Sequence, residues 1–188
     1  HGRQAQSLAY SVDAGMTWTP HAGNPVLDRE SPDFRDPKVF RWGGREGYWV
    51  MVAVEAAHRQ VVLYSSPDLR TWSLLSEFGP AHAVDGVWEC PDLFPVPVAG
   101  TDETRWVLVV SLMPGALAGG GGTQYFVGDF DGARFTPERL STGTDLAGYD
   151  WLDHGRDYYA AVSFDNVPEH RRLMIGWANN WDYAAETP

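Results

Sequence analysis

The chain has 188 residues, with 14 Lys and Arg against 25 Asp and Glu, and a formal net charge of -11. This length suits one domain with a sizeable core, and the negative charge argues against nucleic acid as a partner, because phosphate backbones are bound by clustered Lys and Arg. One cysteine excludes an intrachain disulfide, the histidines form no spaced ligand set, and no apolar run approaches a membrane span, so we expect no metal, no cofactor and no membrane partner.

Short apolar or alternating runs, separated by turn residues, follow one another along the chain. In order they occupy residues 7–12, 37–42, 47–55, 60–66, 105–113, 123–130, 157–164 and 172–179. Each run has the length of a strand and is rich in Val, Tyr, Trp and Phe, whereas no long stretch keeps a period of 3.6 residues. The sequence therefore predicts an all-β fold.

Some of these runs end in similar hairpins. AYSVDAGMTW (9–18) and LYSSPDLRTW (63–72) both carry Tyr-Ser, a turn led by Asp, and Thr-Trp. YFVGDFDGARF (125–135) repeats the pattern with an Asp-Gly turn and a closing aromatic residue. Repeated hairpins of this kind favour the blades of a β-propeller, each with four antiparallel strands, over a β-sandwich.

Two acidic residues interrupt apolar segments. Glu89 lies in VWECPDLFP, and Asp36 lies between Arg35 and Pro37 in DFRDPKVFRW. The simpler interpretation is a solvent-facing glutamate on a strand and a local Arg-Asp ion pair, because charged residues are seldom buried unless paired. The alternative is that both acids lie at the start of equivalent inner strands of successive blades, so that they meet at one end of the propeller.

The segments FRDPKVF and ECPDLF resemble the Arg-Asp-Pro and Glu-Cys motifs of glycoside hydrolase family 32, which contains invertases, levanases and inulinases. The likeness extends in order through QAQSLAYSVDAGMTW, NPVL, VVLYSSPDLRTW, QYFVGDFDGARF, LDHGRDYYAAVSF and LMIGWANNWDY. The resemblance implies a five-bladed propeller, of which this chain covers about three blades. It also implies hydrolysis of β-fructofuranosyl linkages in levan, inulin or sucrose, a fructose-containing oligo- or polysaccharide as partner, and secretion.

The resemblance also implies roles for single residues. Glu89 would be the general acid/base, and Asp36 would bind ring hydroxyls and stabilise the oxocarbenium-like transition state. Arg35 would help to hold the sugar and the charges of the acids, and Cys90 would shape the pocket beside Glu89. Three further positions would line the sugar site: Asp157, Tyr158 and Trp177. The alternatives for two of them are a strand start at Asp157 and a core position for Trp177.

One departure from the family pattern concerns the nucleophile. In the family this is an aspartate in a Trp-Met-Asn-Asp-Pro-Asn-Gly motif of the first blade, and the present sequence contains no such motif. We therefore expect residues 1–188 to be a partial propeller, without the first blade's motif, the fifth blade and the C-terminal β-sandwich. Such a piece is expected to be inactive alone, because the catalytic pair is incomplete, and to associate through its exposed blade edges or with the missing segments.

Two other classes of protein remain open. The segment SVDAGMTW (11–18) also fits the Asp-box hairpin of sialidases. A sialidase additionally needs an arginine cluster and a tyrosine-glutamate nucleophile, and the sequence contains no series of motifs that matches them. The other class is a propeller that binds carbohydrate without catalysis, which the missing nucleophile favours and the Arg-Asp-Pro and Glu-Cys motifs oppose. Levan, inulin and sucrose, and hydrolysis and fructosyl transfer, are not separated by the sequence.

Overall fold

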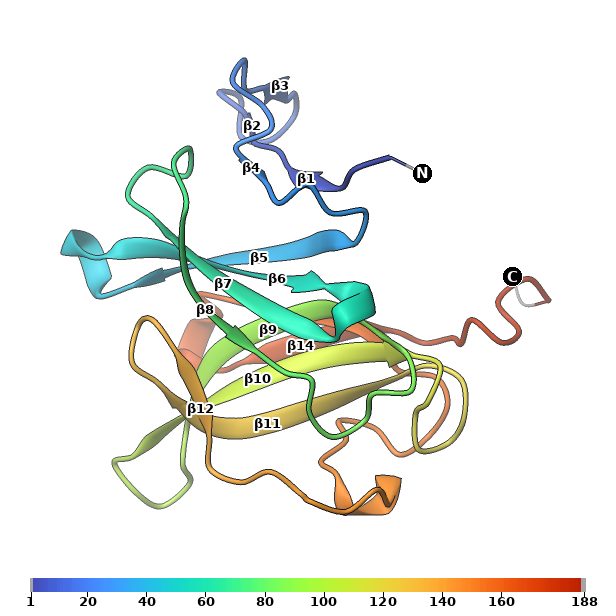
Figure 1. Ribbon diagram of the computed structural model, residues 1–188. Coiled ribbons are helices and arrows are strands. Elements are labelled where there is room, and N and C mark those ends of the chain that lie inside the picture. The colour runs from blue at the N-terminus through green and yellow to red at the C-terminus, as the bar shows by residue number, and fades with distance from the viewer. Residues whose placement is uncertain (1, 187–188) are drawn as a thin grey trace.

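The computed structural model describes residues 2–186, and antiparallel sheets dominate it (Figure 1). The first four-stranded sheet has the order β5-β6-β7-β8, and the second has the order β12-β11-β10-β9. Their strands are β5 (Phe34–Trp42), β6 (Tyr48–Glu55), β7 (Gln60–Ser66), β8 (Ser73–Phe78), β9 (Val87–Pro97), β10 (Thr104–Met113), β11 (Gly122–Phe130) and β12 (Phe135–Pro137). Strands that follow one another in sequence are paired in both sheets, so each sheet is a meander. The prediction of an all-β fold is confirmed.

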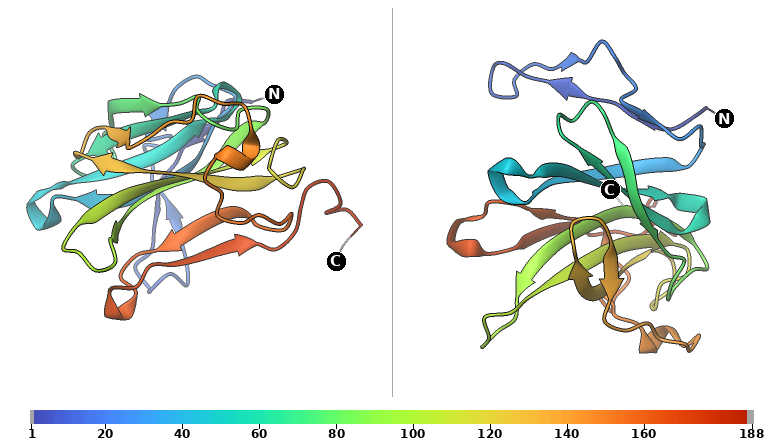
Figure 2. Two further views of the ribbon diagram at one scale, coloured as in Figure 1. Left: turned by 90° about the horizontal axis from the view of Figure 1, so that it is seen from below. Right: turned by 60° about the vertical axis from the view of Figure 1, so that its left-hand side comes forward.

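Three smaller sheets have two strands each. They pair β1 (Ala5–Gln6) with β4 (Leu27–Asp28), β2 (Ala9–Tyr10) with β3 (Thr19–Pro20), and β13 (Tyr159–Phe164) with β14 (Leu173–Trp177). The described residues therefore contain two four-stranded sheets, where the sequence predicted about three. The left view of Figure 2 shows the order in space: the β9–β12 sheet lies between the β5–β8 sheet and the β13–β14 pair. Strand β9 contacts both β5 and β13.

Helical structure within residues 2–186 is limited to short 3-10 turns. These are η1 (Gly44–Glu46), η2 (Ala56–His58), η3 (Leu146–Gly148) and η4 (Pro168–His170). In the described part of the chain, no helix has the length and apolar character needed to cross a membrane.

The repeated hairpins of the sequence form the same kind of turn. The carboxylate of Asp13 accepts a hydrogen bond from the backbone N–H of Thr17 at 2.9 Å, between β2 and β3. Asp68 accepts one from the N–H of Thr71 at 2.8 Å, between β7 and β8. Asp131 repeats this contact between β11 and β12. Each turn joins the last two strands of its sheet, and each aspartate satisfies backbone donors that the turn would leave unpaired.

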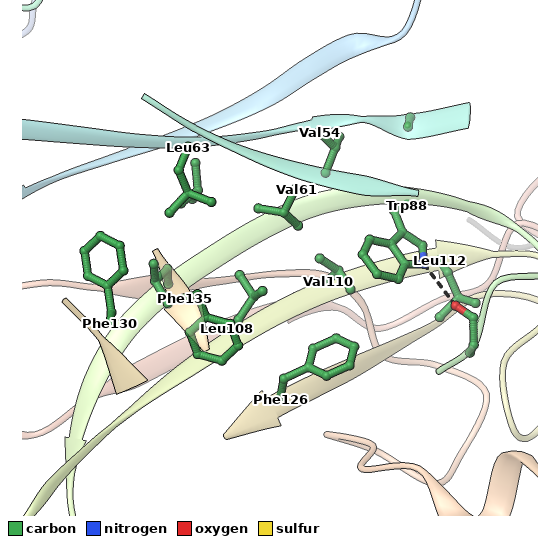
Figure 3. Close-up of a cluster of buried hydrophobic side chains, with 14 of the residues drawn as sticks. Val54, Val61, Leu63, Trp88, Leu108, Val110, Leu112, Phe126, Phe130 and Phe135 are labelled. Atoms are coloured by element: carbon green, nitrogen blue, oxygen red, sulfur yellow. Dashed lines mark hydrogen bonds between the residues drawn. The ribbon is translucent and has the colours of Figure 1, made fainter. Parts of the chain in front are cut away.

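The main core lies between the two four-stranded sheets. Figure 3 shows Val54, Val61 and Leu63 of the first sheet pointing toward Leu108 and Val110 of the second. All five side chains are fully buried, which follows from the period of two that places alternate residues of each strand on one face. The residues that the strands bury also include Trp88, whose indole N–H donates to the carbonyl of Ala83 at 2.9 Å. This core fixes the strand that carries Glu89.

A matched pair of leucine substitutions tests the location of the core. Leu63→Ala removes a fully buried side chain and is expected to lower the free energy of unfolding by about 2–5 kcal/mol. Leu140→Ala removes a side chain that is 48% exposed and is expected to change it by about 0.5 kcal/mol or less. Urea unfolding followed by tryptophan fluorescence measures both values. Equal effects would contradict a core between the two sheets.

Candidate active site

Strands β5, β9 and β13 contain the same irregularity. In each strand, two residues lie opposite a single residue of the paired strand, which is a β-bulge. The first bulge residue has a positive φ although it is not glycine: Asp36 (φ 57°), Cys90 (φ 48°) and Ala160 (φ 53°). The second residue is proline in two of the strands, Pro37 and Pro91. Proline has no N–H to donate to the ladder, and a bulge tolerates it because the ladder is interrupted there. Bulges of this kind redirect the neighbouring side chains.

The side chains just before the three bulges meet one another. They are Arg35 of β5, Glu89 of β9 and Tyr159 of β13. Arg35 donates from Nη2 to Oε1 of Glu89 at 3.0 Å, and the Tyr159 hydroxyl donates to Oε2 of Glu89 at 2.5 Å. The Glu89 side chain is 25% exposed and Tyr159 is 3% exposed. Glu89 is therefore a half-buried carboxylate held by two donors, and the interpretation as a simple solvent-facing residue does not describe it.

Asp36 contacts the bulge of the next sheet. Its Oδ2 accepts a hydrogen bond from the backbone N–H of Cys90 at 2.9 Å and lies 3.8 Å from the Cys90 sulfur. The same oxygen lies 4.0 Å from Nε of Arg35. One guanidinium group thus stands beside both Asp36 and Glu89, and its charge offsets the repulsion between the two carboxylates.

Arg35 is in turn held by a third acid. Its Nη1 donates to Oδ1 of Asp33 at 3.0 Å and lies 3.4 Å from Oε1 of Gln4. Burial by itself would lower the pKa of Arg35, but its hydrogen bonds to Glu89 and Asp33 outweigh burial and raise that pKa above the ordinary value. Arg35 therefore supplies a permanent positive charge in the middle of the acidic group.

The two neutral groups of the cluster stay protonated. Burial, followed by the negative charges of Asp36 and Glu89, raises the pKa of the Cys90 thiol to about 12. Burial and then the hydrogen bond to Glu89 raise the pKa of Tyr159 above its ordinary range. A thiol with so high a pKa is a poor nucleophile at neutral pH, because the thiolate is the reactive form. Tyr159 remains a hydrogen-bond donor to Glu89.

The remaining predicted site residues lie at the edge of this group or beyond it. Asp157 is exposed and accepts a hydrogen bond from the Tyr183 hydroxyl. The Tyr158 ring packs so closely on Gly176 that a Cβ there would lie 2.7 Å from it. Trp177 pairs with Tyr159 across β13 and β14, and its ring centroid is 4.9 Å from that of Trp181. Within the described residues, Asp157, Tyr158 and Trp177 make no hydrogen bond to Arg35, Asp36 or Glu89.

Sequence reasoning missed Tyr159, although it selected the preceding residue. A one-residue shift along a strand moves a side chain to the opposite face. The structure supplies the equivalence, because Tyr159-Ala160-Ala161 occupies in β13 the place that Arg35-Asp36-Pro37 occupies in β5. In the region that the structure describes, no group of three His, Cys, Asp or Glu side chains is arranged to hold a metal ion. The side chains that meet here provide the carboxyl groups of Glu89 and Asp36 and the fixed positive charge of Arg35.

Known proteins resemble the whole of this chain. The levanase of Bacillus subtilis is 49% identical over 192 residues, an alignment that covers 100% of this chain and 27% of the levanase. An extracellular exo-inulinase of Aspergillus niger is 43% identical and is matched over 99% of this chain and 36% of its own length. The crystal structure of an exo-inulinase from Aspergillus awamori superposes with a TM-score of 0.92 at 42% identity, covering 99% of this chain and 38% of that one.

The chain thus spans between about a quarter and two fifths of the length of these relatives. The family described as the N-terminal domain of glycosyl hydrolases family 32 matches residues 1–188. The bulged strands that carry Arg-Asp-Pro and Glu-Cys therefore lie in a recognised enzyme domain, and the chain belongs to glycoside hydrolase family 32.

Proposed function

We propose that this chain forms part of a β-fructofuranosidase and supplies the acid/base half of its active site. The observation that carries the proposal is the position of Arg35, which hydrogen-bonds to Glu89 of the adjacent sheet and lies beside Asp36 of its own strand. Related proteins named levanase and exo-inulinase support a fructose-containing oligo- or polysaccharide as the substrate. The name of the extracellular exo-inulinase supports secretion of the longer protein.

The proposed reaction is a retaining hydrolysis with two carboxyl groups. Glu89 donates its proton to the glycosidic oxygen of the leaving group, while a nucleophilic carboxylate attacks the anomeric carbon of the fructosyl unit. Glu89 then removes a proton from water, which releases fructose from the covalent intermediate. Retaining pairs stand about 5–5.5 Å apart, and the family's Asn-Asp-Pro motif supplies the nucleophile. We propose that this motif lies outside the 188 residues and that they alone turn over no substrate.

The other members of the cluster would assist this reaction. Asp36 would accept hydrogen bonds from ring hydroxyls and stabilise the positive charge of the oxocarbenium-like transition state. Arg35 would hold both acids in place. Cys90 fits a packing role, because its thiol stays protonated at neutral pH and its backbone N–H orients Asp36. Three outer positions are proposed to line the fructosyl site: Asp157, Tyr158 and Trp177.

We further propose that the two four-stranded sheets and the β13–β14 pair are consecutive blades of a five-bladed propeller. The two four-stranded sheets share the turn chemistry of Asp68 and Asp131, which Asp13 repeats between β2 and β3, and the inner strands of all three units share the bulge. In this arrangement residues 1–188 form about three blades of the catalytic domain. The bulges then lie at one end of the propeller axis, where a terminal fructosyl unit binds.

Substitution of the two acids in the longer protein tests the proposed roles. Glu89→Gln is expected to lower kcat on a natural fructan by about 100- to 10,000-fold, because the amide cannot transfer a proton. The loss should be smaller on an activated aryl fructoside, whose leaving group needs no protonation. Asp36→Asn should lower kcat on both substrates, because it removes charge stabilisation from the transition state.

The rate of fructose release from the two substrates measures these effects. The isolated 188 residues, which are expected to release no fructose, serve as the inactive reference. Glu138→Gln is the matched control, since Glu138 pairs with Arg105 on the exposed surface. Near-parental activity of Glu89→Gln on the natural fructan would exclude its role as the acid.

Two adjacent tyrosines give a second test. Tyr159→Phe removes one of the two donors to Glu89 and is expected to lower kcat/KM by about 10- to 100-fold, because hydrogen bonds to charged groups contribute about 1.5–3 kcal/mol. Tyr158→Phe removes a hydroxyl that makes no contact with Glu89 and should have the smaller effect. Steady-state kinetics with a thermal midpoint for each variant measures both. Parental kcat/KM in Tyr159→Phe would contradict the assignment of Tyr159.

A further inference from the structure

A second polar group crosses the same three strands farther along their length. Lys38 of β5 donates from Nζ to the backbone carbonyl of Ser163 in β13 at 2.5 Å, and its Nζ lies 3.4 Å from Oδ2 of Asp92 in β9. The same Asp92 oxygen accepts a hydrogen bond from the backbone N–H of Ser163 at 2.7 Å. One lysine and one aspartate thus connect three strands that belong to three different sheets.

Asp92 of this group is buried and Lys38 is partly buried, and none of the roles proposed above uses either residue. Asp92 is 1% exposed, and its Oδ1 has no hydrogen-bond partner within the described residues. The Lys38 side chain is 24% exposed. Charged residues are almost never buried as deeply as Asp92 unless they are paired. The contact with Lys38 therefore allows Asp92 to be buried at this position.

The Lys38–Asp92 pair lies just beyond the bulges that bring the candidate-site side chains together. Lys38 follows the bulge of β5, Asp92 follows the bulge of β9, and Ser163 lies beyond the bulge of β13. The side chains that meet in the candidate site lie just before these bulges. Backbone ladders fix strands within a sheet, but no ladder joins β5, β9 and β13 to one another. Their relative placement must therefore come from contacts between sheets, and the Lys38–Asp92 pair makes such contacts with both neighbouring strands.

We propose that the Lys38–Asp92 pair is a positioning device of the candidate site. By tying β13 to β9 and β5 behind the bulges, the pair sets the separation at which Arg35, Glu89 and Tyr159 hydrogen-bond. An ion pair has a preferred distance and geometry, whereas apolar side chains can slide past one another. The Lys38–Asp92 pair therefore favours one position of the three strands relative to each other. The catalytic consequence rests on the proposed function, but the geometric consequence does not.

Three variants of the longer protein test this proposal: Lys38→Met, Asp92→Asn and the double substitution. Asn at position 92 keeps an oxygen that can accept from the N–H of Ser163, and the double variant leaves no unpaired buried charge, so it remains informative if a single variant fails to fold. We expect kcat on a natural fructan to fall about 10- to 100-fold with KM nearly unchanged, because small displacements of catalytic groups act mainly on kcat.

A second measurement does not depend on activity. Cys90 lies in the bulge of β9 with its N–H bound to Asp36, so a shift of β9 relative to β5 will change the access to its sulfur. We expect alkylation of Cys90 by iodoacetamide, followed by peptide mass mapping well below the unfolding temperature, to be several-fold faster in the three variants. If the unaltered protein releases no fructose, the proposed function fails, whereas this measurement still tests the positioning.

The matched control is the exposed ion pair between Arg105 and Glu138, 2.5 Å apart. The double variant Arg105→Met/Glu138→Gln removes an ion pair from the surface, far from the three bulged strands' candidate site, and should leave kcat, KM and Cys90 alkylation at parental values. Parental kcat and parental Cys90 alkylation in the Lys38→Met/Asp92→Asn variant, even with a lowered thermal midpoint, would overturn the proposal. The pair would then contribute only to stability.

Discussion

The hydrogen bond between Arg35 and Glu89 is the contact on which the site depends, because it joins two sheets that share no backbone ladder. Arg35 reaches Glu89 because both residues precede a bulge at equivalent places in their strands. The same guanidinium lies beside Asp36 and is held on its other side by Asp33. Without this positive charge, three carboxylates at close range would repel one another, and the inner strands would separate where the chemistry requires them to meet.

The bulges also explain how a glutamate lies in so apolar a segment. Trp88 turns into the core, where it is fully buried, and Glu89 on the opposite face turns toward Arg35 and Tyr159. The backbone strain of a non-glycine residue with positive φ, about 1–3 kcal/mol at each bulge, is offset by this packing. Strain of this kind is common at active sites, and here it redirects side chains from three sheets to one point.

Much of the fold was predictable from the sequence, and the geometry of the site was predictable only in part. The runs at 47–55, 60–66 and 105–113 correspond to β6, β7 and β10, because buried strands carry continuous apolar segments. The motifs around Asp36 and Glu89 drew attention to two side chains that both contact or lie beside Arg35 in the structure. Positive φ at Asp36, Cys90 and Ala160 has no signature in composition, and it determines which side chains meet. For that reason neither the contact of Tyr159 with Glu89 nor that of Lys38 with Asp92 was foreseen.

The central claim is that Glu89 and Asp36, brought together by Arg35, act on one fructosyl unit. The most direct test is a crystal structure of the longer protein carrying Glu89→Gln, soaked with an inulin-type oligosaccharide. We predict that the side chain at position 89 lies within about 2.6–3.2 Å of the glycosidic oxygen. Asp36 should hydrogen-bond to hydroxyls of the same furanose ring. A fructosyl unit bound with both side chains beyond hydrogen-bond reach would contradict the account.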